Sequence, residues 1–292
     1  MRVLRRALIA ASNSPLLHRM ASQLSAARAV AMRFIAGETL DDALAVARHL
    51  NALGTSVSLD ALGEAVDDPS VAHAASAVYR ETIARMAEEG IEGSISVKLT
   101  QLGLAIDFEL CRDLLSDVCA AAAAVGSHVT VDMEHSGFTQ PTEDLVLALR
   151  AHGHDNVGCA VQSYLYRTPD DVAKLTAAGA SLRLCKGAYA EPPDIAFQRK
   201  ADVDAAYARL TETLLREGVY PRIATHDRRL IHHAKNSARR HQRGPEEFEF
   251  QMLYGVSESL QRQIVADGYR LRIYVPFGSE WYPYFVRRLA ER

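Results

Sequence analysis

Two adjacent arginines, Arg287 and Arg288, stand near the end of this 292-residue chain, close to Tyr284 and Glu291. Residues three, four and seven positions apart share one face of a helix, so these four side chains would project together. The opposite face would carry the apolar residues Tyr282, Phe285, Val286 and Leu289. A guanidinium is a planar, permanently charged fork that can bind a carboxylate through two parallel hydrogen bonds. The pattern predicts an anion clamp suited to an amino acid, although basic residues also complement the dipole of an ordinary C-terminal helix.

A second group of polar residues stands where apolar, strand-like segments end. The group comprises Lys98, Asp132, Gln162, Arg183, Lys186, Thr225 and His226. In a barrel of parallel strands, the chemistry is carried at the C-terminal ends of the strands. One polar residue in such a place usually completes a buried hydrogen-bond network. Five strand ends with polar residues in register favour a functional site.

The elements that must position these residues alternate along the chain. The predicted strands are Arg33–Ala36, Ser56–Ala61, Ser94–Leu99, Val129–Met133, Gly158–Gln162, Leu182–Lys186, Arg222–Thr225, Phe248–Leu253 and Arg272–Pro276. The predicted helices include Glu38–Leu53, Ser70–Glu89, Phe108–Ala124, Glu143–His152, Pro169–Ala178, Val203–Glu217 and Arg228–Ala238. This alternation is typical of βα units and predicts an α/β fold, a distorted (βα)8 barrel of the TIM type. Because Arg272–Pro276 is one strand too many, we expect the last helix to be displaced and to lie over the barrel mouth.

Length and composition predict a single domain over residues 1–292, with residues 1–30 as an N-terminal helical arm and residues 31–292 as the barrel and clamp helix. A hydrophobic content of 48% can form one large core. A net charge of -3 argues against nucleic acid as a partner. The four cysteines form no CxxC pair, which disfavours a metal site and indicates a reducing cytoplasmic compartment. No apolar run is long enough for a transmembrane segment.

Several motifs, taken in order, resemble one enzyme family. They are SVKLTQLG (96–103), RLCKGAYAE (183–191), ATHD (224–227), FQMLYG (250–255), YVPFG (274–278) and YFVRRLAER (284–292). Together they resemble the FAD-dependent proline dehydrogenases, and the resemblance runs from about Arg33 to the end. It implies a distorted (βα)8 barrel with the last helix on the mouth. It also supplies the flavin, because the chain has neither a GxGxxG fingerprint nor a P-loop.

The resemblance also implies a role for individual residues. Lys98, Arg287 and Arg288 would bind the proline carboxylate, and Leu253, Tyr189, Tyr274 and Tyr284 would enclose its ring. The FAD contacts would come from Met133, Gln162, Arg183, Lys186, Gly187, Ala188, Thr225 and His226. Arg183 would act in catalysis by stabilising the anionic reduced flavin. Asp132 would act with it by keeping the neighbouring cations oriented.

The implied reaction is oxidation of L-proline to Δ1-pyrroline-5-carboxylate, with a hydride passing from C5 to FAD and the electrons then passing to a membrane quinone. The expected location is the cytoplasm, with peripheral contact to the cytoplasmic membrane. The chain ends directly after the clamp, so we expect a separate pyrroline-5-carboxylate dehydrogenase to consume the product.

Four alternatives remain open from the residues alone. A Schiff-base aldolase would use Lys98 or Lys186 as its nucleophile. A metal-dependent hydrolase would use His152 and His154, although these residues precede a predicted strand. A noncatalytic ligand-binding barrel would purify without colour. A flavin oxidase of a related cyclic amino acid would pass its electrons to oxygen, and no residue distinguishes it from a quinone-reducing enzyme.

Overall fold

The computed structural model describes residues 30–290. The predicted arm, apart from Val30, and Glu291 of the predicted clamp therefore lie outside the described residues. Across the described part of the chain, none of the helices is both long and apolar enough to cross a membrane.

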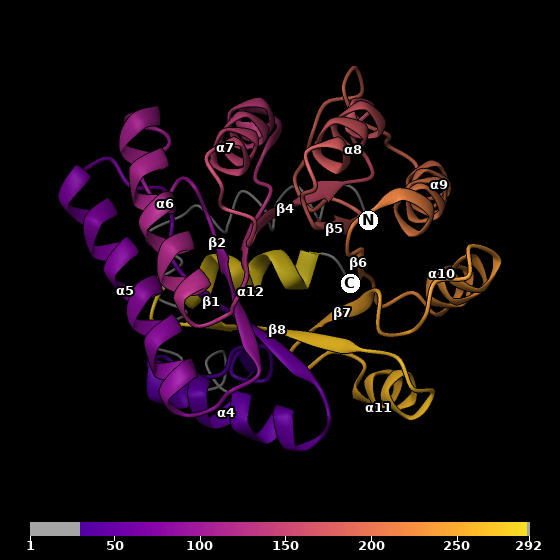
Figure 1. The fold of residues 1–292 in the computed structure, drawn as a ribbon, viewed down its shortest axis with the longest axis horizontal. Helices are drawn as coiled ribbons and strands as arrows, with labels where there is room; N and C mark the ends of the chain where they lie inside the picture. Colours follow the sequence, from indigo (N-terminus) through magenta and orange to yellow (C-terminus); the bar gives the residue numbers. More distant parts are fainter. Residues whose placement is uncertain (1–29, 291–292) are drawn as a thin grey trace.

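Eight parallel strands close into a barrel in the order β1 to β8, with each strand bonded to the next and β8 bonded to β1. The strands are β1 (Ser56–Ala61), β2 (Gly93–Val97), β3 (Val129–Val131), β4 (Val157–Gln162), β5 (Leu182–Cys185), β6 (Arg222–Ala224), β7 (Glu249–Leu253) and β8 (Leu271–Phe277). The outer helices are α4 (Leu40–Ala52), α5 (Pro69–Glu88), α6 (Phe108–Ala124), α7 (Thr139–Ala151), α8 (Thr168–Ala177), α9 (Lys200–Glu217), α10 (Arg228–Arg240) and α11 (Glu258–Ala266). Figure 1 shows them around the strands. The predicted (βα)8 barrel is confirmed.

The prediction of a strand at Arg33–Ala36 is wrong. The segment turns on itself, with the Phe34 amide donating to the Ala31 carbonyl at 2.8 Å, and it meets the barrel through the Ala36 amide and the Pro276 carbonyl at 2.9 Å. Its apolar side chains pack beneath the last helix instead of joining the sheet. The first barrel strand is therefore β1, and the segment predicted as surplus, Arg272–Pro276, is part of the eighth strand, β8.

The barrel separates apolar and polar residues by the alternation of its strands. Val57 and Leu59 of β1, like Ile95 and Val97 of β2, are fully or almost fully buried in the main hydrophobic cluster between strands and helices. The alternate positions face the interior, where side chains from strands that are not neighbours bond to one another. Arg222 of β6, for example, donates to the Thr130 hydroxyl of β3 at 2.6 Å. Barrel interiors of this class are usually filled by branched apolar residues, so the polar interior has another purpose than packing.

Short acidic and hydroxyl side chains start several of the helices that surround the barrel. Thr39 and Asp42 form a capping box at the start of α4. Asp107 accepts from the Leu110 amide at 2.7 Å before α6, and Asp227 accepts from the Arg229 amide at 3.0 Å before α10. Each cap satisfies an amide that has no partner inside the helix. Asp227 is the last residue of the ATHD motif, and its role as the cap of α10 accounts for an aspartate at that position.

The final helix, α12 (Trp281–Ala290), lies across the barrel opening instead of beside it (Figure 1). Trp281, Tyr282, Tyr284, Phe285 and Val286 are all buried in a second hydrophobic cluster. That cluster includes residues at the C-terminal ends of the barrel, namely Leu62 after β1, Val256 after β7 and Tyr274 in β8. The predicted placement of the last helix over the mouth follows from this packing. Its first turns are buried on both faces, because one face contacts residues 31–35 and the other contacts the barrel.

Candidate active site

A group of charged side chains crosses the mouth end of the barrel, centred on Arg183 of β5. Its Nε donates to Gln251 Oε1 at 2.6 Å, and one terminal nitrogen donates to Ser96 Oγ at 2.8 Å. The other terminal nitrogen forms an ion pair with Asp132 Oδ1. The guanidinium carbon also lies 5.3 Å from the centre of the Tyr274 ring. With 4% of its surface exposed, Arg183 is held on all sides by partners from other strands.

Lys98 lies between two carboxylates. Its Nζ is 2.8 and 3.0 Å from the two oxygens of Asp60 and 3.9 Å from Asp132 Oδ2. Burial alone lowers the pKa of Lys98, but the charges of Asp60 and Asp132 outweigh it and raise that pKa above its ordinary value. Lys98 is thus an ammonium, which argues against a Schiff-base role because the nucleophile must be the neutral amine.

Asp132 joins the two cations Lys98 and Arg183 to Tyr274 of β8. Its second oxygen accepts a hydrogen bond from the Tyr274 hydroxyl at 2.8 Å. Burial raises the pKa of Asp132, while Arg183 and Lys98 oppose that rise. Burial and the Asp132 charge raise the pKa of Tyr274 well above its ordinary value, so the phenol keeps its proton and donates. The resemblance implied that Asp132 orients the neighbouring cations, and the structure places Lys98, Asp132, Arg183 and Tyr274 in one bonded group.

A second group of polar side chains lies at the ends of β5 and β6. Lys186 Nζ is 2.6 Å from Asp204 of α9 and 3.6 Å from Asp227. His226 Nε2 accepts from the Leu253 amide at 3.0 Å, which joins the ends of β6 and β7. Burial, followed by the charges of Arg288 and Lys186, lowers the pKa of His226 to about 4, so the imidazole is neutral at physiological pH. The Thr225 hydroxyl accepts from the Asp227 amide at 3.1 Å and so supports the start of α10.

The loop after β5 carries the predicted residues Gly187, Ala188 and Tyr189. Gly187 has φ +110, and a Cβ there would lie 2.3 Å from the Tyr164 ring, so only glycine fits. Tyr189 lies edge-on to the His135 ring, with 6.4 Å between the ring centres. On the neighbouring strand, Gln162 ends β4 and donates to the Glu134 carbonyl at 2.9 Å. Met133 is the second residue after β3, next to Asp132, and is half-buried.

The helix over the mouth supplies the predicted clamp residues. Tyr284 is buried, and the guanidinium carbon of Arg288 lies 5.3 Å from the centre of its ring. The charge of Arg288 contributes to the lowered pKa of His226, which follows β6. Arg287 is on the same helix, and its side chain lies outside the described part. Leu253, at the end of β7, is half-buried at the mouth.

Sequence reasoning missed three acidic residues that organise the site. Asp60 is fully buried at the end of β1 and bonds Lys98, and Glu249 of β7 is almost fully buried in the interior. Glu134 accepts from the amide and hydroxyl of Thr100 at 3.1 and 2.7 Å. The alternation of Ser56, Ser58 and Asp60 in the first strand was the available signal for Asp60, because Ser94, Ser96 and Lys98 alternate in the same way.

The cysteines and the pair His152 and His154 are not part of this charged group. Cys111, Cys119 and Cys159 are buried, and burial raises the pKa of each thiol to about 12, so none is a reactive thiolate. Among the described residues, no group of His, Cys, Asp and Glu side chains could hold a metal ion. His152 and His154 follow α7 and precede β4, at the barrel end opposite the mouth.

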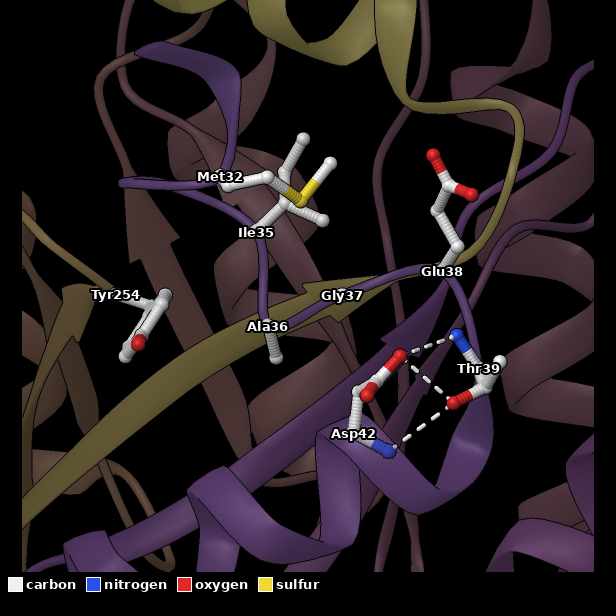
Figure 2. Close-up of a pocket in the computed structure, with 8 residues that line it drawn as sticks. All are labelled: Met32, Ile35, Ala36, Gly37, Glu38, Thr39, Asp42 and Tyr254. Carbon is white, nitrogen blue, oxygen red and sulfur yellow. Dashed lines mark hydrogen bonds between the residues drawn. The ribbon is translucent and has the colours of Figure 1, made fainter. Parts of the chain in front are cut away.

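A cavity of ≈ 420 Å³ lies beside the start of α4 (Figure 2). It is lined by Met32, Ile35, Ala36, Gly37, Glu38, Thr39, Asp42 and Tyr254. Figure 2 shows the Asp42 carboxylate turned toward Thr39, to which it is bonded. None of these residues belongs to the charged group at the mouth, so the cavity is a feature separate from the predicted site.

The fold and this site define a (βα)8-barrel enzyme whose charged centre lies beneath a C-terminal helix. The comparisons with known proteins give the family. The family model described as proline dehydrogenase matches residues 43–292. Proline dehydrogenase 2 of Bacillus subtilis is 38% identical over 281 residues, which cover 96% of this chain and 92% of that protein. Proline dehydrogenase of Deinococcus radiodurans is 38% identical over 271 residues, which cover 90% of this chain and 86% of that protein. The chain belongs to the proline dehydrogenase family, which oxidises proline to Δ1-pyrroline-5-carboxylate.

Solved structures show the same architecture. Proline utilization A from Bdellovibrio bacteriovorus, inactivated by N-propargylglycine, superimposes with a TM-score of 0.86 at 27% identity over 91% of this chain. A Bradyrhizobium japonicum proline utilization A mutant gives a TM-score of 0.78 at 26% identity over 91% of this chain. This chain spans 33% and 31% of those two longer proteins, respectively. The predicted family and fold are confirmed.

Proposed function

We propose that this proline dehydrogenase uses FAD, bound at the barrel mouth among Met133, Gln162, Arg183, Lys186, Gly187, Ala188, Thr225 and His226. Two observations support the fit. Tyr164 leaves room only for a glycine at 187, and this close packing fixes the path of the chain directly after β5, where we propose that the flavin binds. The side chains of Arg183 and Lys186 provide positive charge on β5 and directly after it, as a flavin and its pyrophosphate require. When bound, FAD would supply the acceptor for the hydride from proline.

We propose that the proline carboxylate is bound by Lys98, Arg287 and Arg288. The face of the Tyr284 ring orients Arg288, because a guanidinium over an aromatic ring is held by the ring quadrupole. Tyr189, Tyr274, Tyr284 and Leu253 would enclose the small apolar ring of the substrate. Tyr274 and Tyr284 share the cluster under α12, which supports a water-poor pocket between the helix and the barrel.

The observation that carries this assignment is the bonded group of Asp60, Lys98, Asp132, Arg183 and Tyr274. Asp132 joins Arg183, on the proposed flavin side, to Tyr274, on the proposed substrate side. Each cation of the group is thereby fixed before the substrate binds, so little reorganisation is needed during the reaction. Asp132 acts by orientation, since its oxygens are already occupied by the Arg183 guanidinium and the Tyr274 hydroxyl.

We further propose that the reduced enzyme passes its electrons to a membrane quinone, that it works in the cytoplasm with peripheral contact to the cytoplasmic membrane, and that a separate pyrroline-5-carboxylate dehydrogenase consumes the product. The family membership supports the quinone. A comparison of turnover with a soluble ubiquinone analogue and with oxygen tests it. Faster turnover with oxygen would identify the protein as an oxidase instead.

The cofactor is tested by an anaerobic visible spectrum of the purified protein before and after addition of L-proline. We expect a yellow protein that bleaches with L-proline and keeps its colour with D-proline. A protein that remains colourless after incubation with FAD would refute the cofactor assignment, whereas a yellow protein that fails to bleach would refute the assigned substrate site.

A further inference from the structure

The interior of the barrel continues the active site toward its floor. Glu249 and Gln251 stand two residues apart on β7 and therefore face the same side, the interior. Gln251 Oε1 accepts from Arg183 Nε at 2.6 Å, and Gln251 Nε2 donates to Glu249 Oε1 at 2.5 Å. Gln251 and Glu249 are 3% and 1% exposed. A continuous chain of bonds thus links Glu249 through Gln251 to Arg183.

Two arginines, Arg272 and Arg222, keep Glu249 ionised. Arg272 donates to both of its oxygens at 2.8 and 3.1 Å, and Arg222 Nε lies 3.8 Å away. Burial alone raises the pKa of Glu249, but the two arginines outweigh it and lower that pKa to about 2. Glu249 is therefore a carboxylate at any pH at which the enzyme works, and it can only accept hydrogen bonds.

This carboxylate decides how the Gln251 amide points. An amide offers two N–H donors on one side and one oxygen acceptor on the other. With an obligate acceptor, Glu249, at one end and an obligate donor, Arg183, at the other, only one orientation satisfies both neighbours. The reverse orientation would place N–H against N–H and oxygen against carboxylate in the buried interior, where unsatisfied polar groups are costly.

We propose that Gln251 is a positioning residue for Arg183 and that Glu249 fixes the Gln251 amide for this task. The Gln251 amide oxygen accepts from Arg183 Nε and, being neutral, places no negative charge beside it. Asp132 and Ser96 hold the terminal nitrogens, so the fork has one orientation relative to the mouth. Without Gln251, the guanidinium can turn toward Asp132, and its charge is then directed away from the proposed flavin.

The inference rests on the proposed function, because its consequence is measured on bound flavin. The test is the midpoint potential of the flavin in the full-length holoenzyme carrying Gln251→Met, which keeps the side-chain volume and removes both hydrogen bonds. We expect the ratio of reduced to oxidised flavin at a fixed potential to fall at least tenfold, a shift of ~30 mV for a two-electron couple. We also expect kcat to fall while the KM for proline stays close to that of the unaltered enzyme, because Gln251 is not among the residues proposed to bind the proline carboxylate.

Two further variants separate positioning from general loss of structure. Gln261→Met removes another buried glutamine, whose amide donates to the carbonyls of Leu253 and Val256, and should leave the potential unchanged. Glu249→Gln should shift the potential in the same direction as Gln251→Met; if it fails to fold, Gln251→Met carries the test alone. An unaltered potential in yellow, folded Gln251→Met would overturn the inference. A colourless unaltered protein would instead refute the proposed function before any variant is compared.

Discussion

Replacement of Asp132 by asparagine is the most direct test of the charged group at the mouth. The change keeps the shape of the side chain and removes its charge. The new amide would place an NH2 group against either the Tyr274 hydroxyl, now 2.8 Å from Oδ2, or the Arg183 guanidinium. Removing one partner of a buried ion pair costs about 3–5 kcal/mol, because the remaining cation stays buried without compensation. Lys98 keeps Asp60, so most of the cost falls on Arg183.

We expect Asp132→Asn to lower both the thermal stability and kcat/KM for proline. If about 3 kcal/mol of the lost interaction is also lost in the transition state, kcat/KM falls roughly 100-fold, since each 1.36 kcal/mol is a factor of ten. The assays are thermal unfolding of the holoenzyme and steady-state oxidation of proline with an artificial electron acceptor.

Glu143→Gln is the matched control for this variant. Glu143 of α7 is 1% exposed and pairs outside the barrel with Arg167, which precedes α8, at 2.7 Å and with Lys174 of α8 at 3.4 Å. The control should lose stability and keep kcat/KM. If Asp132→Asn lost no more activity than the control, the orienting role of Asp132 would be wrong.

Three further predictions concern single positions. Gly187→Ala places a Cβ against Tyr164 at φ +110, so we expect weaker FAD binding and a loss of about 1–3 kcal/mol in stability. Gly90→Ala is the control, because Gly90 also has a positive φ but has open space around it, and this variant should keep its FAD. The ratio of flavin to protein absorbance measures the FAD content of both. The lowered pKa of His226 means that the unfolded chain binds more protons below its ordinary pKa of 6.5, so the free energy of unfolding should fall by about 3 kcal/mol as the pH drops from 6.5 to 4. That dependence should disappear in His226→Asn and persist in a variant of the exposed His232, as urea unfolding at each pH would show. Tyr274→Ser removes the phenol that bonds Asp132 and leaves more space in the proposed substrate wall. We therefore expect a smaller ratio of kcat/KM for proline to kcat/KM for 4-hydroxyproline. An unchanged ratio would show that Tyr274 is not part of that wall.

Local patterns were sufficient to predict most of the fold. Strands and helices were found because each carries its own signal, and Phe108–Ala124 was predicted with the bounds of α6. Arg33–Ala36 failed because a short apolar run has the same composition whether it joins a sheet or packs beneath a helix. Only the contacts with Trp281 and Phe285 distinguish the two, and these residues lie at the other end of the chain.

The site was predictable as a set of residues and less so as a network. Lys98, Asp132 and Arg183 were identified individually by their places at strand ends. Their partners, Asp60 and Gln251, come from strands distant in the sequence, and no local spacing records which carboxylate meets which cation. The resemblance to a family supplied the cofactor and substrate roles, because the chain has none of the glycine-rich fingerprints that predict a nucleotide site from residues alone.

The polar interior indicates where the stability of the barrel originates. Arg222, Arg272 and Glu249 gain little net stability from burial, because desolvation offsets most of the attraction within an ion pair. The apolar layer between strands and helices, which contains residues such as Leu59 and Val97, must therefore supply the folding free energy. Because the interior charges contribute little to folding, their fixed hydrogen-bond geometry is the property that the barrel gains from them. That geometry holds the Arg183 guanidinium in one orientation, through a chain of bonds from Glu249 by way of Gln251 to Arg183 and on to Asp132 at the mouth.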